Sequence, residues 1–157
     1  MKKITPWLWF ETEAEEAATF YTSVFKNSRI LSVDRFGEGG YVEAGSVMTV
    51  AFELDGQEFV GLNGRPAFTF NESVSFMVSC DSQDEVDEYW DRLTEGGEES
   101  QCGWLKDKYG VSWQIIPTEL LTLLKDPDPE RAQRAMQAML QMRKIDLEVL
   151  RKAAATA

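Results

Sequence analysis

The sequence contains no histidine and only two cysteines, Cys80 and Cys102. Two cysteines are too few for a disulfide framework, and without histidine they cannot complete an ordinary zinc site. We therefore expect two free thiols and no metal centre built on these side chains.

Basic residues are also few. Sixteen lysines and arginines stand against twenty-seven aspartates and glutamates, which gives a net charge of -11. Such a charge repels phosphate backbones and anionic membrane surfaces. No apolar run approaches the roughly 18 residues of a membrane-spanning helix, and the start of the chain carries no small-residue cleavage site. We predict a cytoplasmic protein that binds neither nucleic acid nor membranes.

The chain does contain an internal repeat. Residues 4–25 and 74–97 each combine a short apolar strand with an acidic amphipathic helix, and this repetition predicts a duplicated module. Three further strands follow each helix: 29–36, 46–54 and 58–62 in the first copy, and 98–101, 103–107 and 111–116 in the second. The pattern therefore predicts two βαβββ modules, at residues 1–64 and 74–117.

A module of this kind has one open apolar sheet face that it cannot bury alone. We expect an α+β fold in which the two modules pair as a single domain, residues 1–117, with their sheets forming a shared cup. Residues 118–157 form a helical extension in which Asp128 caps a helix and Pro129 takes its first position. Its apolar stripe, which includes Met136 and Met139, packs on its own domain or covers a sheet edge or a partner.

Several segments carry a resemblance to a known family: WLWF, AEEAATFY, AGSVMTV, FVGLNG, SFMV, QCGWLKDKYGVSWQI and AMLQM. Together they resemble the PhnB-like branch, also called 3-demethylubiquinone-9 3-methyltransferase-like, of the vicinal-oxygen-chelate superfamily, which includes glyoxalases and bleomycin-resistance proteins. The resemblance covers nearly the whole chain. It implies paired βαβββ modules with a cup between them and a homodimer.

The resemblance also locates the positions at which metal-using relatives hold a divalent ion. Four inward-facing strand positions supply His, Gln or Glu in those relatives, and here they correspond to Thr5, Gly61, Ser75 and Gln114. Two hydroxyls, a glycine and a neutral amide cannot offset the dehydration of a transition-metal ion, but they can bond a neutral organic ligand. We expect no metal and no cofactor, and neither glyoxalase nor dioxygenase chemistry.

The methyltransferase name would require a site for a methyl donor. Such donors are commonly held by a glycine-rich turn between a strand and a helix. The one glycine cluster, residues 37–40, joins two predicted strands instead and is typical of a hairpin loop. A methyl donor held in some other way within the cup stays open.

Strand alternation predicts the lining of the cup. If Thr5 points inward, Trp7 and Trp9 do so too, while Leu8 and Phe10 face the helices. The predicted ligand-binding residues are Thr5, Trp7, Trp9, Met48, Asn63, Ser75, Met77, Cys102, Trp104 and Gln114.

Three functions fit such a cup. The first is a metal-independent protein that binds a small organic molecule among aromatic side chains. The second is an enzyme, by resemblance a transferase such as a methyltransferase acting on an aromatic or quinone-like substrate, with a base such as Glu53 or Tyr109 beside the ligand. The third is a structural dimer whose cup is filled by Trp7, Trp9 and Met48.

Overall fold

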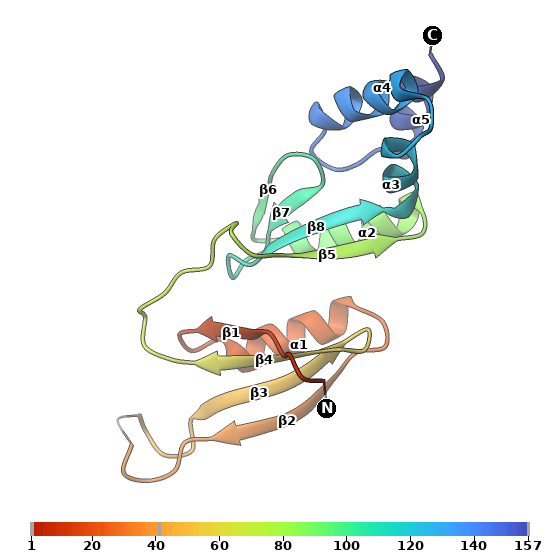
Figure 1. The fold of residues 1–157 in the computed structure, drawn as a ribbon. Helices are drawn as coiled ribbons and strands as arrows, with labels where there is room; N and C mark the ends of the chain where they lie inside the picture. Colours follow the sequence, from red (N-terminus) through yellow and green to blue (C-terminus); the bar gives the residue numbers. More distant parts are fainter. Residues whose placement is uncertain (1, 41, 157) are drawn as a thin grey trace. The chain divides into compact units, whose positions relative to one another are not determined.

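The computed structural model describes residues 2–40 and 42–156, which form two compact units. Unit 1 is Met1–Thr69 and unit 2 is Phe70–Ala157. Each unit contains one four-stranded mixed sheet with a helix on one face (Figure 1).

Unit 1 follows the βαβββ order that the repeat predicts. Its elements are β1 (Trp7–Phe10), α1 (Ala14–Val24), β2 (Arg29–Arg35), β3 (Val47–Leu54) and β4 (Gln57–Asn63). The strands lie in the order β1-β4-β3-β2. Strand β1 pairs parallel with β4, and the other pairs are antiparallel. The first strand begins later than predicted, so Thr5 lies in the segment before β1.

Helix α1 packs on the sheet through small residues. Its buried positions are Ala14, Ala17, Ala18, Tyr21 and Val24. They meet alternate strand residues that are also buried, namely Leu8, Phe10, Val50, Phe52, Leu54 and Phe59. The ring of Phe52 stacks on Tyr21 and on Phe59, with centroids 6.1 and 5.5 Å apart. This aromatic cluster fixes which face of the sheet α1 covers.

Unit 2 repeats the arrangement. Its first elements are β5 (Ser75–Cys80), α2 (Gln83–Thr94), β6 (Glu98–Glu99), β7 (Trp104–Lys106) and β8 (Ser112–Pro117), with strand order β5-β8-β7-β6. The first and last strands again pair parallel. Ser82 caps α2, because its side chain accepts a hydrogen bond from the Glu85 amide. The predicted duplication and the α+β class are thus confirmed.

Three helices follow the second sheet: α3 (Thr118–Leu124), α4 (Pro129–Leu140) and α5 (Leu147–Ala155). Asp128 caps α4 and Pro129 takes its first position, as predicted. The helices enclose a core of their own with the end of β8, formed by Ile116, Leu120, Met142, Ile145, Leu147 and Leu150. The sequence pattern offered no separate sign of α5, which Asp146 caps. Among the described residues, no helix is long and apolar enough to cross a membrane.

Candidate functional site

Each sheet has a second face, turned away from the helix of its own unit, which we call its open face. In unit 1 alternation and pairing place these residues of β1, β3 and β4 on the first open face: Trp7, Trp9, Thr49, Ala51, Glu53, Glu58, Val60 and Leu62. In unit 2 they place these residues on the second open face: Ser75, Met77, Ser79, Trp104, Lys106, Ser112, Gln114 and Ile116, the last of which packs against the C-terminal helices. The predicted shared cup depends on how the two units are placed relative to each other, and it stays a prediction.

Two tryptophans dominate the first open face. Trp7 lies beside Val60 and is 59% exposed, while Trp9 lies beside Leu62. Leu8 and Phe10 point to the helix side and are buried, as the alternation predicts. A tryptophan this exposed presents a large flat apolar surface to whatever contacts the sheet.

The ring of Trp9 is held from three directions. Its Nε1 donates a hydrogen bond to the carbonyl oxygen of Arg65 at 2.8 Å, and its ring meets Phe68 edge to face at 4.9 Å. The backbone of Gly64 approaches so closely that a Cβ there would lie 2.4 Å from Trp9 Cζ2. The Trp9 side chain is therefore held in one position by its own unit.

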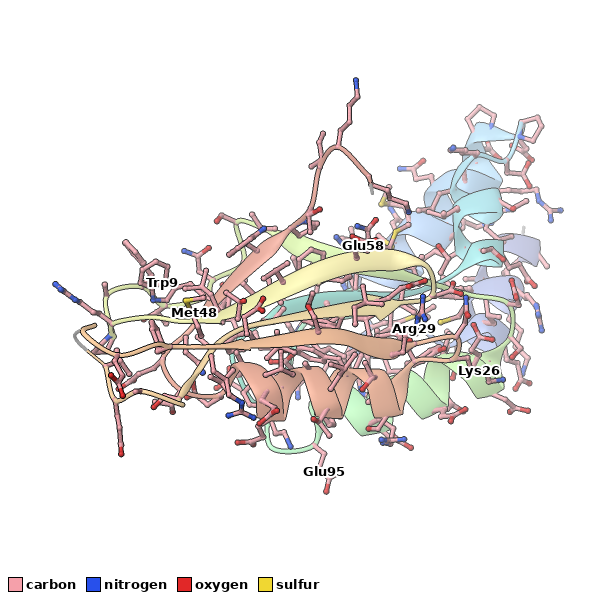
Figure 2. The ribbon with its side chains drawn as sticks, turned by 90° about the horizontal axis from the view of Figure 1, so that it is seen from below. Trp9, Lys26, Arg29, Met48, Glu58 and Glu95 are labelled. Atoms are coloured by element: carbon pink, nitrogen blue, oxygen red, sulfur yellow. The ribbon has the colours of Figure 1, made fainter. Side chains whose placement is uncertain are left out.

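Met48 reaches the first open face through a β-bulge. Asp34 pairs with Thr49 and Arg35 with Val47, so Met48 is the extra residue between them. A bulge shifts the alternation of side chains by one. Figure 2 shows Met48 and Trp9 on the side of the sheet opposite α1.

The predictions for Gly61 and Asn63 were wrong by one position in the strand. Gly61 pairs with Leu8 and faces α1, where a Cβ would lie 3.3 Å from that of Ala14. Asn63 also lies on the helix side. Its Oδ1 accepts from the Ala14 amide at 2.9 Å, and its Nδ2 donates to the Val47 carbonyl at 3.1 Å. Asn63 thus caps α1 and lines a separate cavity of about 420 Å³ on that side.

The second open face carries a polar pair at its centre. Gln114 Nε2 donates to Ser75 Oγ at 2.8 Å, and Gln114 pairs with Met77 on one side and Trp104 on the other. Met77 is 51% exposed. The predicted register of this module is therefore correct, and it brings four of the predicted residues together on one surface.

Cys102 lies apart from this group. It occupies the turn between β6 and β7 with a positive φ of 61°, and its amide donates to the Met142 carbonyl at 2.8 Å. The turn is thereby fixed to the segment before α5. Its position is structural, and the prediction that Cys102 contacts a ligand has no support from this geometry.

The two thiols should differ sharply in reactivity. Cys80 is buried, and burial, with Glu85 and Asp81 nearby, raises its pKa to about 12. A thiol reacts as its thiolate, so Cys80 should be inert. We expect iodoacetamide at pH 8 to alkylate native protein once, at Cys102, and both cysteines after unfolding. Peptide mass spectrometry checks this result, and modification of Cys80 in native protein would contradict it.

Sequence reasoning missed one buried charge near the second open face. Asp107 is 3% exposed, and its Oδ1 accepts from the amides of Tyr109 and Val111 at 2.8 and 3.1 Å. Its Oδ2 accepts from Trp113 Nε1 at 2.9 Å. The turn sequence Asp-Lys-Tyr-Gly, in which an aspartate bonds the backbone ahead of it, was the available signal. Asp107 fixes the β7–β8 hairpin that carries Trp104 and Gln114.

Two mixed sheets, each built as βαβββ with its own helix, define the vicinal-oxygen-chelate class of fold. Within this class the chain belongs to the 3-demethylubiquinone-9 3-methyltransferase family, whose sequence profile matches residues 2–116. A comparison with proteins of curated function gave no match.

Solved structures agree with this assignment. The PhnB protein of Bacillus cereus is 39% identical with a TM-score of 0.69, over 74% of this chain and 99% of that one. A Pseudomonas aeruginosa protein is 19% identical with a TM-score of 0.62, over 74% and 98% of the two chains. The fosfomycin resistance protein FosX of Listeria monocytogenes is 14% identical with a TM-score of 0.54, over 74% and 90%. The last two likenesses concern the fold alone.

One FosX structure contains Mn(II). The question is whether the side chains on the open faces of this chain could coordinate such an ion. Ser75 and Gln114 bond each other, and the open-face positions of β4 are Glu58, Val60 and Leu62. Only Glu58 is a strong ligand for a divalent ion. The described residues include no cluster of three or more histidine, cysteine, aspartate or glutamate side chains able to hold a metal. The donor set does not fit a transition metal, and we derive no chemistry through one.

Proposed function

We propose that this protein binds a small, flat, partly apolar organic molecule through its open faces, without a transition metal. The single observation that carries the proposal is the pair of tryptophans on the first open face, Trp7 exposed and Trp9 fixed by Gly64, Arg65 and Phe68. A rigid indole beside an exposed one offers stacking surface at little entropy cost. The homodimer is likewise a proposal.

The second open face supports the same function with polar groups. Because Gln114 donates to Ser75, the orientation of its amide is fixed, and the amide carbonyl oxygen is the acceptor that this position offers. Trp104 and Met77 flank it on the neighbouring strands. Such a surface of apolar contacts with a few oriented polar groups is typical of small-molecule sites.

A transferase is the second candidate, and the description of the family favours it. Glu53, the base expected for this case, has its carboxylate 3.6 Å from Arg29 Nε at the far edge of the first sheet. The glycine segment 37–40 lies in a hairpin, as predicted, in which the Phe36 amide donates to the Ser46 carbonyl and the Gly45 amide donates to the Phe36 carbonyl. A methyl donor would therefore need a site other than the glycine turn between strand and helix.

Native mass spectrometry of protein purified without added metal tests the binding proposal. We expect a retained organic molecule or, after its removal, saturable binding of a methoxybenzoquinone probe in calorimetry, with no stoichiometric metal. Stoichiometric manganese, nickel, iron or zinc that survives mild chelation would overturn metal independence. The same spectra report whether the particle is a dimer.

Removing the Trp9 ring should weaken probe binding about fivefold, because one aromatic stacking contact is worth about 1 kcal/mol. We expect Gly64→Ala to weaken it as well, since the added methyl displaces the ring. Met136→Ala, which removes an exposed apolar side chain from α4, should leave the affinity unchanged. Equal affinity in Trp9→Ala and wild type would contradict a ligand on this face.

A further inference from the structure

A small cavity lies within unit 2, at the end of the sheet formed by β6, β7 and β8. Its volume is about 150 Å³, and its walls include Glu72, Glu98, Glu99, Trp104, Lys106 and Ser112. This space corresponds to roughly five water molecules of liquid volume and suits a compound of about four to seven non-hydrogen atoms. Its walls belong to unit 2 and not to the tryptophan surface of unit 1, but three of the wall residues, Trp104, Lys106 and Ser112, also belong to the second open face.

Ser112 is the feature that the fold does not explain. The residue is 1% exposed, and its Oγ has no hydrogen-bond partner among the residues that the structure describes. Its strand neighbours on this face are Lys106 and Ser75, and Ser75 already accepts from Gln114. A buried hydroxyl without a partner costs stability, so its presence on a cavity wall points to a partner that the cavity admits.

The charges around the cavity determine whether that partner is a cation or an anion. Lys106 Nζ is engaged by Glu72 Oε1 at 2.5 Å, and Glu99 accepts from Trp90 Nε1 at 2.7 Å and lies 3.7 Å from Arg143. The pKa of Lys106 is raised first by its hydrogen bond to Glu72 and further by the nearby charges of Glu72 and Glu98. Three wall carboxylates against two cations, Lys106 and Arg143, leave an excess of one negative charge, in a chain whose net charge is already -11. An anion would be repelled, and a cation would be attracted.

We propose that this cavity binds a compact organic cation, an amino alcohol or a quaternary ammonium alcohol. The ammonium group lies against Glu98 and the face of the Trp104 indole, which attracts cations through its ring quadrupole. The ligand oxygen forms a hydrogen bond with Ser112 Oγ. The acid supplies charge selectivity, the ring supplies the surface, and the buried hydroxyl supplies orientation.

Calorimetric titration with choline, beside its neutral isostere 3,3-dimethyl-1-butanol, tests the charge requirement. The two molecules have the same shape, so we expect saturable binding of choline and at least fivefold weaker binding of the alcohol. Equal affinities, or no choline binding up to about 10 mM, would overturn the proposal, since cation–π and charge contacts at such sites exceed that difference.

Two variants test the assigned residues. Glu98→Gln keeps the shape and should weaken choline binding at least fivefold, whereas Glu95→Gln, three residues away at the end of α2, should not. Ser112→Ala should weaken choline binding yet raise the unfolding midpoint by about 2–4 °C, because it removes a hydroxyl that is unsatisfied without ligand. If Ser112 had only a structural role, its replacement would not weaken choline binding while it raises the unfolding midpoint.

The outcomes separate this proposal from the one for unit 1. Trp9→Ala should reduce quinone binding and leave choline binding unchanged. Loss of choline affinity in Trp9→Ala, or equal losses in Glu95→Gln and Glu98→Gln, would show that the cation binds elsewhere or through general charge, and would overturn the assignment.

Discussion

Replacing Asp107 by alanine is expected to lower the free energy of unfolding by about 3–5 kcal/mol, because two buried donors and one partly buried donor lose a charged acceptor at once. The carboxylate accepts from two backbone amides in the β7–β8 turn and from the indole of Trp113, and the substitution removes both of its oxygens. Urea denaturation followed by tryptophan fluorescence measures the loss.

The isosteric amide gives the matched comparison. Asp107→Asn keeps the shape and one acceptor oxygen for the amides of Tyr109 and Val111, but its NH₂ group then faces the indole N–H of Trp113. We expect an intermediate loss of about 2 kcal/mol. Glu88→Ala, on the exposed side of α2, should change the free energy of unfolding by less than about 0.5 kcal/mol. A loss of less than about 1 kcal/mol in Asp107→Ala would contradict this role for the carboxylate.

Sequence pattern was sufficient for much of the fold, and the reason lies in the helix faces. Small or aromatic residues at helical spacing, such as Ala14, Ala17 and Tyr21, require a sheet to cover, and alternation then assigns Leu8 and Phe10 to that side. The same reasoning placed Ser75 and Gln114 on one face, where they bond each other.

Alternation fails where a single residue changes the register. At β4 the family positions suggested an inward Gly61, but the close approach of Ala14 and Phe10 requires the glycine on the helix side. At β3 a bulge turns Met48 to the face opposite the one that strict alternation from Val50 would give it. A bulge depends on pairing with β2, and one strand read by itself gives no sign of it.

The cavity beside Ser112 was beyond sequence reasoning for a different reason. Its walls come from the segment before β5, from β6 and from the β7–β8 hairpin, which lie far apart in the chain, from Glu72 to Ser112. A serine in an apolar strand is ordinarily a solvated or backbone-bonded residue. Only the three-dimensional packing shows that its hydroxyl is buried and, among the described residues, without a partner.

The second large effect concerns Gly103, which connects the second sheet to the C-terminal helices. Its φ is +86°, and its amide donates to the Arg143 carbonyl at 2.7 Å. An added Cβ would lie 2.9 Å from Ile116 Cδ1, 3.0 Å from the Ile115 carbonyl oxygen and 3.1 Å from Ile145 Cγ1. Gly103→Ala therefore combines left-handed backbone strain of about 1 kcal/mol with overpacking of about 1–3 kcal/mol, and we expect a total loss of about 3 kcal/mol.

Gly45 separates the two contributions, because it has nearly the same backbone angle, φ +91°, with no atom within 4 Å of an added Cβ. Gly45→Ala should therefore lose only the strain, about 1 kcal/mol in urea denaturation. The excess loss in Gly103→Ala measures how tightly the β6–β7 turn is packed against Ile145. Hydrogen exchange should also rise in α5 of that variant alone, since the turn fixes the segment that precedes α5 through the Met142 and Arg143 carbonyls. Equal losses of unfolding free energy in the two variants would mean that the C-terminal helices accommodate the added methyl group without further destabilisation. The β6–β7 turn would then not hold these helices in place.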